Sequence, residues 1–253
     1  MANICIVVPC YNEETRLPVN DFREYLLIHY DVDFCFVNDG STDGTKDLLV
    51  KLCKENNNHL FSISLPENKG KAEAVRIGII QSLSRKDYEI IGFWDADLST
   101  PLDEIQYLKT YIDKNTNYAF AFGSRIKTLG VVIERKLLRH YFGRVFATFA
   151  SGIVRLPVYD TQCGAKLIKT EVAEKVFCYP FCSKWLFDIE IFARMIEIYG
   201  HDEAQKMMVE VPLRKWIDKG NSRITTSYLF KMPFELFSIF AKHRKNMRRA
   251  DNI

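Results

Sequence analysis

The sequence predicts an α/β fold in which a mostly parallel sheet carries helices on both faces, followed by an amphipathic C-terminal tail. Over the first half of the chain, apolar runs of strand length alternate with amphipathic helical stretches, which is the pattern of parallel strands joined by crossover helices. Each run ends in polar, turn-forming residues. The chain has 253 residues, 47% of them hydrophobic, with 12 glycines and 8 prolines. This composition fits a globular α/β chain and excludes a disordered or fibrous one.

The first two predicted strands end in polar residues. Residues 4–8 form an apolar run that Pro9 breaks, and Asn12 or Thr15 is expected to cap the helix that follows. The sequence Pro-Cys-Tyr-Asn-Glu at 9–13 places an aromatic ring and polar side chains where a nucleobase would fit. The second strand, 34–37, runs into turn residues at 38–45. Both sets of polar groups are expected at the same edge of the sheet, where open α/β sheets bind ligands.

The third predicted strand, 60–65, leads into a basic helix start. In that helix Ala72, Val75, Ile79 and Leu83 recur at helical spacing and would pack on the sheet. The cations Lys69, Lys71 and Arg76 cluster around the start of the helix. Cations there oppose the helix dipole, so the cluster indicates either an anion-binding site or a solvated basic turn.

The fourth predicted strand, 90–94, ends directly in two acids, Asp95 and Asp97. Two carboxylates so close raise each other's cost of ionisation, and a hard divalent cation that also binds a phosphate relieves it. A strand that runs into a solvated turn, with Asp97 as a helix cap, would look the same. Thr100 followed by Pro101 predicts the start of the next helix.

The cysteines and the charge limit the class of protein. The seven cysteines are odd in number and several lie inside apolar segments, which suggests reduced thiols in a cytoplasmic protein. Cys178 and Cys182 are spaced too widely, and lack matching histidines, to indicate zinc. The N-terminus runs straight into a strand, so we expect no signal peptide. The net charge of +3 is concentrated in residues 242–253, but without a recognisable nucleic-acid-binding module we expect no nucleic-acid partner.

Two segments combine cations with apolar residues. In 134–154, basic residues precede turns that are apolar nearly all round, and in 226–249 apolar residues precede a basic run. A buried helix, or a packed terminal helix with a charged end, would show the same pattern. Because two such segments occur in one chain, we favour helices that lie on an anionic membrane surface. No stretch reaches the roughly 18 uninterrupted apolar residues of a membrane span.

Several motifs occur in order and together resemble a known family. The family 2 inverting glycosyltransferases, which have the Rossmann-like GT-A fold, are similar at 8–14 (Val-Pro-Cys-Tyr-Asn-Glu-Glu), 37–45, 68–70 with Arg76, 95–97 (Asp-Ala-Asp) and 122–125 (Phe-Gly-Ser-Arg). The segments 160–167, 184–190, 210–212 and 219–223 resemble the dolichyl-phosphate β-glucosyltransferase branch. The resemblance covers residues 3–225. Asn38 stands where many relatives have an acid, and Ala72-Glu73 replace the usual small residues.

The resemblance implies a set of site residues. Tyr11 and Asp39 would hold the uracil of a UDP-sugar, and Glu13 would support the nucleotide. Asp97, with Asp95 beside it, would ligate Mg²⁺ or Mn²⁺ on the diphosphate. The further residues expected to bind substrate are Pro9, Asn12, Lys69, Lys71, Arg76, Trp216 and Arg223.

Two acceptors remain open at this stage. A polyprenyl phosphate is already anionic and needs no general base, and Arg125, Arg135 and Arg139 would position it. A sugar hydroxyl of a lipid-linked oligosaccharide or capsular polysaccharide would need a base, for which Asp188 is the candidate, with Glu190 close behind it in the sequence. Either acid could equally be one that starts a helix. A third alternative is a non-catalytic nucleotide-sugar or lipid-binding module, against which the intact Asp95 and Asp97 argue. A sugar nucleotidyltransferase is expected to have a glycine-rich loop after the first strand, and this chain has Pro-Cys-Tyr-Asn-Glu there instead.

We therefore expect one metal-dependent glycosyltransferase domain over 1–225. Its first part, 1–100, would bind nucleotide and metal, and its second part, 101–225, would form the acceptor side. The tail, 226–253, would lie on the membrane, which makes the protein peripheral on a cytoplasmic face. A homo-oligomer stays open.

Overall fold

The computed structural model describes residues 3–127, 129–134, 151–152, 154–220 and 226–250. The first half contains β1 (Ile4–Cys10), α1 (Val19–Leu26), β2 (Val32–Asn38), α2 (Thr45–Glu55), β3 (Leu60–Ser64), α3 (Lys71–Arg85), β4 (Ile90–Trp94), α4 (Asp103–Lys114) and β5 (Phe120–Ser124). The second half contains β6 (Val132–Glu134), β7 (Ala165–Lys169), α6 (Thr170–Val176), α7 (Phe187–Tyr199), α8 (His201–Met207), β8 (Met208–Pro212), β9 (Lys215–Ile217) and α9 (Thr226–Ala250).

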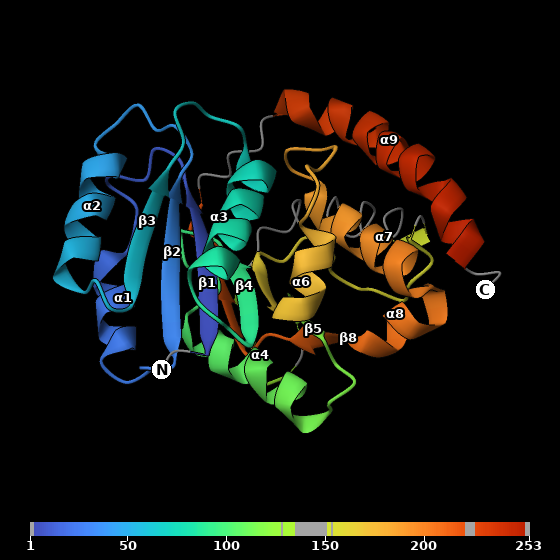
Figure 1. The fold of residues 1–253 in the computed structure, drawn as a ribbon, viewed down its shortest axis with the longest axis horizontal. Helices are drawn as coiled ribbons and strands as arrows, with labels where there is room; N and C mark the ends of the chain where they lie inside the picture. Colours follow the sequence, from blue (N-terminus) through green and yellow to red (C-terminus); the bar gives the residue numbers. More distant parts are fainter. Residues whose placement is uncertain (1–2, 128, 135–150, 153, 221–225, 251–253) are drawn as a thin grey trace.

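One seven-stranded sheet runs through the molecule in the order β3-β2-β1-β4-β7-β5-β8 (Figure 1). The strands β1, β2, β3 and β4 are parallel, as are β5 and β8, while β7 is antiparallel to both of its neighbours. The prediction of a mostly parallel sheet is therefore confirmed. The chain leaves β1 on one side toward β2 and β3 and returns on the other side to β4, so the sheet has its topological switch point between β1 and β4.

The reversed strand β7 brings a second segment to this switch point. Its first residue, Ala165, pairs with Trp94, the last residue of β4. Residues 160–164 therefore arrive at the same edge at which Asp95 and Asp97 begin. The backbone N–H of Asp95 donates a hydrogen bond to the carbonyl oxygen of Gly164 at 3.1 Å.

Each face of the sheet packs its own set of helices. Ile4, Ile6 and Val8 point to the face covered by α1, α2 and α4, and Cys5 and Val7 point to the face covered by α3, α6, α7 and α9, as the two-residue period of a strand requires. Strands β1 and β2 are buried on both faces, which explains why they read as continuous apolar runs. The helix face predicted for 71–85 is confirmed, since Ala72, Val75 and Ile79 are fully buried and Leu83 packs against that core.

Two predicted helix starts are wrong. Helix α1 begins at Val19 without a side-chain cap, because Asn12 instead accepts the backbone N–H of Thr42 at 2.8 Å and so holds a neighbouring loop. Helix α4 begins at Asp103, and the carbonyl of Thr100 accepts the indole N–H of Trp94 at 2.8 Å. At Asn12 a tertiary contact uses the side-chain oxygen that the local pattern assigns to a cap.

Helix α9 lies along the outer side of α7 (Figure 1). Leu236, Ile239 and His243 are buried, whereas Phe234 and Phe237 are 75% and 68% exposed, so the described part of the helix is amphipathic. Among the described residues, no helix is both long enough and apolar enough to span a membrane. The other segment predicted to meet a membrane, 134–154, lies almost entirely outside the described residues.

Candidate functional site

The two acids after β4 differ in their surroundings. Asp95 forms an ion pair with Lys71, whose Nζ lies 2.5 Å from Oδ1. One oxygen of Asp97 accepts the backbone N–H of Ser99 at 2.9 Å. Burial raises the pKa of Asp97, and the negative charge of Asp95 raises it further. The charged form of Asp97 is thus poorly stabilised by the chain alone, which is the condition that a bound cation relieves.

Lys71 is the first residue of α3 and faces three acids. Burial alone would lower the pKa of its ammonium group, but the carboxylates of Asp95, Asp188 and Asp97 raise it. These acids explain why a cation is stable at a helix N-terminus, where the dipole opposes it. The sequence left two interpretations of the basic helix start open, an anion-binding site and a solvated basic turn. Because Lys71 is paired with acids, the solvated turn is wrong for this residue.

Gly164 lets the reversed strand approach the acid pair. A Cβ atom at this position would lie 1.9 Å from Oδ2 of Asp95, which no real contact allows. The carboxylate of Asp95 is therefore seated against the bare backbone of Gly164. Any larger residue there would displace Asp95 or separate β7 from β4.

The Asp188 side chain is buried and paired. Its Oδ1 lies 2.6 Å from Nζ of Lys166, and these side chains are 4% and 0% exposed. The same ammonium donates to the carbonyl oxygens of Thr161 at 3.2 Å and Cys163 at 2.5 Å. Asp188 thus lies in an internal ion pair with Lys166. Sequence reasoning missed Lys166, although a lysine inside an apolar strand is the signal that would have found it.

Asp39 binds the turn before α3. Its two oxygens accept the backbone N–H groups of Lys69 at 2.8 Å and Gly70 at 2.9 Å. Burial raises the pKa of Asp39. These hydrogen bonds and the positive charge of Lys184 act in the opposite direction and offset only part of this rise. Asp39 and Lys184 therefore lie at the same turn, and Lys184 is a second residue that sequence reasoning left out of the site.

The remaining predicted nucleotide-side residues fall at the ends of β1 and β2 or on α3. Pro9 and Tyr11 are half-buried at the end of β1. Glu13 is buried, and its backbone N–H donates to the hydroxyl of Thr45 at 2.7 Å. The Asn12 amide and the Glu13 backbone thereby tie the loop after β1 to the loop after β2.

Lys69 and Arg76 lie differently, although both are near the start of α3. Lys69 is 44% exposed, with Nζ 3.9 Å from a carboxylate oxygen of Glu67. Arg76 donates two hydrogen bonds to Glu73, at 2.8 and 2.6 Å. Lys69 is thus available at the edge of the sheet, whereas Arg76 is engaged on its own helix.

Arg125, at the end of β5, is held by Asp160. Nε and Nη2 donate to the two carboxylate oxygens at 2.6 and 2.7 Å, and the guanidinium lies 5.5 Å from the ring of Trp216. Burial alone would lower the pKa of Arg125, but Asp160 raises it. The structure therefore brings Arg125 and Trp216 together. Three other predicted residues, Arg135, Arg139 and Arg223, lie outside the described residues.

Glu190 lies on α7 and joins that helix to α9. Its Oε1 is 3.0 Å from Arg194, 3.2 Å from Lys242 and 3.1 Å from Nε2 of His243. Burial alone would raise the pKa of Glu190, but hydrogen bonds from His243, the backbone of Cys182 and Arg194 lower it to about 2.

The same cluster has the composition of a metal site. Cys182, Glu190 and His243 place their ligand atoms within 4.8 Å of one another, so α9 supplies the histidine that the sequence around Cys182 lacks. However, Nζ of Lys242 already lies 3.1 Å from the Cys182 sulfur and Arg194 shares Glu190. We therefore interpret this cluster as an ionic attachment of α9.

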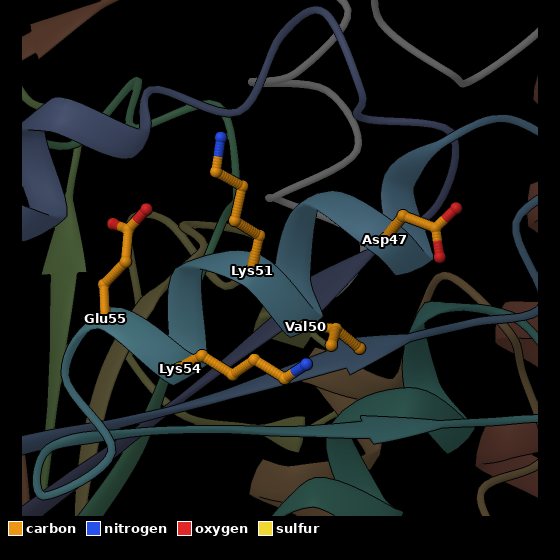
Figure 2. A pocket seen from close by; sticks show the side chains of 5 residues that line it. All are labelled: Asp47, Val50, Lys51, Lys54 and Glu55. Atoms are coloured by element: carbon orange, nitrogen blue, oxygen red, sulfur yellow. The ribbon is translucent and has the colours of Figure 1, made fainter.

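A surface hollow on α2 is separate from these groups. It is lined by Asp47, Val50, Lys51, Lys54 and Glu55, all from that one helix (Figure 2). The residues that converge at the carboxyl edge of the sheet come instead from β1, β2, α3, β4 and β7. Convergence from several elements marks that edge as the functional site.

The acid pair fits a divalent cation. Carboxylate oxygens are the ligands that hard ions such as Mg²⁺ and Mn²⁺ prefer, and the raised pKa of Asp97 reflects negative charge that the chain leaves uncompensated. Two side chains leave the other coordination positions to water or to oxygens of a ligand.

Comparison with known proteins agrees with this geometry. Residues 5–177 match the model of glycosyl transferase family 2. This chain belongs to that family. It is therefore a glycosyltransferase, as the resemblance of its motifs predicts, and its sheet and switch point are those of the GT-A fold.

Three curated relatives are named as dolichyl-phosphate beta-glucosyltransferases. The one from Trichomonas vaginalis is 31% identical over 254 residues, covering 95% of this chain and 74% of the relative. The human protein is 31% identical, covering 86% of this chain and 72% of its own length. The Saccharomyces cerevisiae protein is 32% identical and covers 74% of this chain and 61% of its own length.

A solved structure supports the fold. Glucosyl-3-phosphoglycerate synthase from Mycobacterium tuberculosis, in complex with Mn²⁺ and UDP-glucose, superposes with a TM-score of 0.68. The match covers 96% of this chain and 79% of the synthase at 16% identity. At this identity the likeness establishes a common GT-A fold.

Proposed function

We propose that this protein transfers glucose, or another hexose, from a UDP-sugar to a polyprenyl phosphate at the cytoplasmic face of a membrane. The relatives named above support a polyprenyl-phosphate acceptor, and the synthase crystallised with UDP-glucose supports a UDP-sugar donor. The observation on this chain that carries the proposal is the buried ion pair of Asp188 with Lys166. An oxygen of Asp188 is already occupied by the buried ammonium group of Lys166, and a phosphate acceptor needs no proton acceptor.

The donor would occupy the edge of the sheet at the switch point. Tyr11, Asp39 and Glu13 would hold the nucleoside, with Pro9, Asn12 and Arg76 lining that side. Asp97 and Asp95 would hold Mg²⁺ or Mn²⁺, which when bound stabilises the charge of the departing nucleoside diphosphate. The ammonium groups of Lys69 and Lys71 would add fixed positive charge to the same leaving group.

The transfer itself needs little proton movement. An oxygen of the acceptor phosphate forms a bond to the anomeric carbon while the bond from that carbon to the UDP oxygen breaks, with inversion. The electron pair leaves with UDP as an anion. Asp160 accepts two of the five guanidinium N–H groups of Arg125, and we assign others to the acceptor phosphate. Trp216, with Arg135, Arg139 and Arg223, would complete the acceptor side.

Helix α9 would bring the site to the lipid. Phe234 and Phe237 are exposed on its outer side, and the exposed Lys231, Lys242 and Arg244 belong to the same helix. Exposed aromatic rings beside cations suit an anionic membrane surface, where each cation contributes about 1 kcal/mol. The segment 134–154 is proposed as a second contact.

Transfer of radiolabelled glucose tests this function. UDP-glucose, a polyprenyl phosphate in vesicles and Mn²⁺ or Mg²⁺ are incubated with the wild type, Asp97→Ala and Asp188→Asn, and the organic-extractable label is counted. We expect labelled lipid with the wild type and Asp188→Asn, and label that forms about 100- to 1,000-fold more slowly with Asp97→Ala. A wild type that binds UDP but labels no lipid would overturn the proposed acceptor.

The same variants address the second candidate, a sugar hydroxyl as acceptor. The position of Asp188 near Lys71, whose pKa it helps to raise, is the observation in its favour. With a hydroxyl acceptor Asp188→Asn would abolish transfer, because no other group is assigned to remove the proton.

A further inference from the structure

The last five residues before α7, which we call the 182–186 loop, are attached to α9 by a serine. The hydroxyl oxygen of Ser183 accepts the backbone N–H groups of Trp185 at 3.2 Å and Leu186 at 2.8 Å, just before α7 begins. The hydroxyl also donates a hydrogen bond to a carboxylate oxygen of Glu235 on α9. Ser183 is buried, so one side chain connects the turn of the loop to the outer helix.

The other side of the 182–186 loop rests on the donor edge. The carbonyl oxygen of Lys184 accepts the backbone N–H of Ala72 at 3.2 Å. The aliphatic part of Lys184 covers Gly70, where a Cβ would come within 2.9 Å of its Cδ. Gly70 has a φ of 95° and donates its N–H to Asp39. The turn that Asp39 binds is thus packed between Asp39 and Lys184.

A second attachment holds the start of the loop. The backbone N–H of Cys182 donates to Oε2 of Glu190 at 2.7 Å. The other oxygen of Glu190 contacts Lys242 and His243 of α9. The loop is therefore fastened to α9 at Cys182 through Glu190 and at Ser183 through Glu235, while Lys184 reaches the donor edge.

We propose that α9 sets the shape of the donor site, with Glu235 as a positioning residue that acts through Ser183 and the 182–186 loop on the turn at 68–71. This inference rests on the proposed function, because it takes the carboxyl edge of the sheet to bind the UDP part of the donor. Lys184 is the residue that transmits the position. If a ligand of α9 shifts the 182–186 loop, its binding changes the affinity for the nucleotide. By reciprocity, the nucleotide then changes the affinity for that ligand by the same factor.

Nucleotide binding without any lipid acceptor tests the proposal. UDP is titrated into the full chain by calorimetry in the presence of Mn²⁺, using the wild type, Glu235→Ala, Ser183→Ala and the double variant. Loss of the shared hydrogen bond is expected to weaken UDP binding about 3- to 10-fold in each single variant. The double variant should bind UDP about as weakly as Ser183→Ala, because Ser183→Ala already removes the hydrogen bond that Glu235→Ala removes. Glu235→Gln keeps an oxygen acceptor and should restore binding to within about 2-fold.

Kinetics separate positioning from general damage. In the transfer assay Glu235→Ala should raise the KM for UDP-glucose by the same factor and leave kcat unchanged. Ser238→Ala is the matched control on α9, since Ser238 is exposed and bonds only to its own helix at Phe234 in the described part of the chain. It should bind UDP like the wild type.

Two results overturn the inference. One is wild-type UDP affinity in both Glu235→Ala and Ser183→Ala, and the other is a loss in Ser238→Ala as large as in Glu235→Ala. Failure of the proposed UDP-sugar donor looks different, because then the wild type itself does not bind UDP, and failure of the proposed acceptor leaves these UDP titrations unaffected.

Discussion

Two acidic centres of this enzyme differ in how their charge is compensated. Asp97 at the end of β4 has a raised pKa, because burial and the charge of Asp95 both disfavour its anion. Glu190 on α7 is also buried, yet hydrogen bonds from His243, the Cys182 backbone and Arg194 lower its pKa to about 2. The chain thus pairs Glu190 directly with cations, whereas Lys71 and the hydrogen bonds from Ser99 offset only part of the cost of burying Asp97.

The difference separates an acid that holds the fold together from one that serves a ligand. Glu190 needs nothing from outside, so its charge stabilises the packing of α7 against α9. In the proposed function a bound cation supplies the further charge that stabilises the Asp97 anion, so the folded protein carries a cost that binding would remove. Asp188 resembles Glu190 in this respect, because buried Lys166 compensates it. Each of the four predictions below alters one partner in this comparison.

The largest expected effect is on stability, from Lys166→Met. The substitution leaves Asp188 buried without its cation, and removal of one partner of a buried ion pair costs about 3–5 kcal/mol of unfolding free energy. Urea denaturation measures it. Lys206→Met is the control, since its contact with Glu203 on α8 is exposed and worth less than about 1 kcal/mol. Equal unfolding free energies of the two variants would show that Lys166 does not stabilise the charge of Asp188.

The next effect is on activity, from Asp97→Ala. Loss of one preorganised group at the leaving group is expected to slow glucose transfer about 100- to 1,000-fold. The melting temperature should not fall, because the pKa of Asp97 is raised in the folded state. Asp103→Asn removes an exposed acid from the next helix and should keep wild-type activity. A rate for Asp97→Ala within a few fold of wild type would contradict the assignment.

A third effect appears in acid. The lowered pKa of Glu190 means that its stabilising contribution is fully present above pH 4.5 and is lost as the pH falls toward 2. A shift from 4.5 to about 2 corresponds to about 3 kcal/mol. Denaturant unfolding at a series of pH values should show Glu190→Gln less stable than wild type at pH 6, with the difference shrinking below pH 4.5. A constant difference would mean that Glu190 is not the titrating group.

The smallest effect is expected in base, at His243. Burial alone would lower the pKa of His243, but the hydrogen bonds that its ring N–H groups donate to Glu190 and Glu197 raise it above 6.5. Its contribution is therefore fully present below pH 6.5 and lost as the pH rises through the raised value. His243→Gln should be about 1–2 kcal/mol less stable than wild type at pH 6 and close to it at pH 9. Parallel stability curves over this range would refute the contribution.

The donor side of the fold follows largely from local pattern. The apolar runs at 34–37 and 90–94 have the length and composition of buried strands, and the structure has β2 and β4 there. Parallel strands end at one edge, so the placement of Asp39 at the same edge of the sheet as Asp95 and Asp97 could be predicted from the sequence. The ordered motifs then predict the glycosyltransferase family, which the family model confirms.

The other half depends on partners that are distant along the chain. Lys166 and Asp188 are separated by 22 positions, and Ser183 and Glu235 by 52, and no periodicity links them. The antiparallel direction of β7 is likewise invisible in a five-residue apolar run. Asn12 shows the same limit from the other direction, since a strong capping residue was used for a tertiary contact.

The reversed strand β7 has a kinetic consequence. It is hydrogen-bonded to β4 on one side and to β5 on the other, so one sheet carries both the Asp95 end of β4 and the Arg125 end of β5. A hinge between these two strands would break the pairings that β7 makes with them. We therefore expect product release to proceed without movement of β4 against β5.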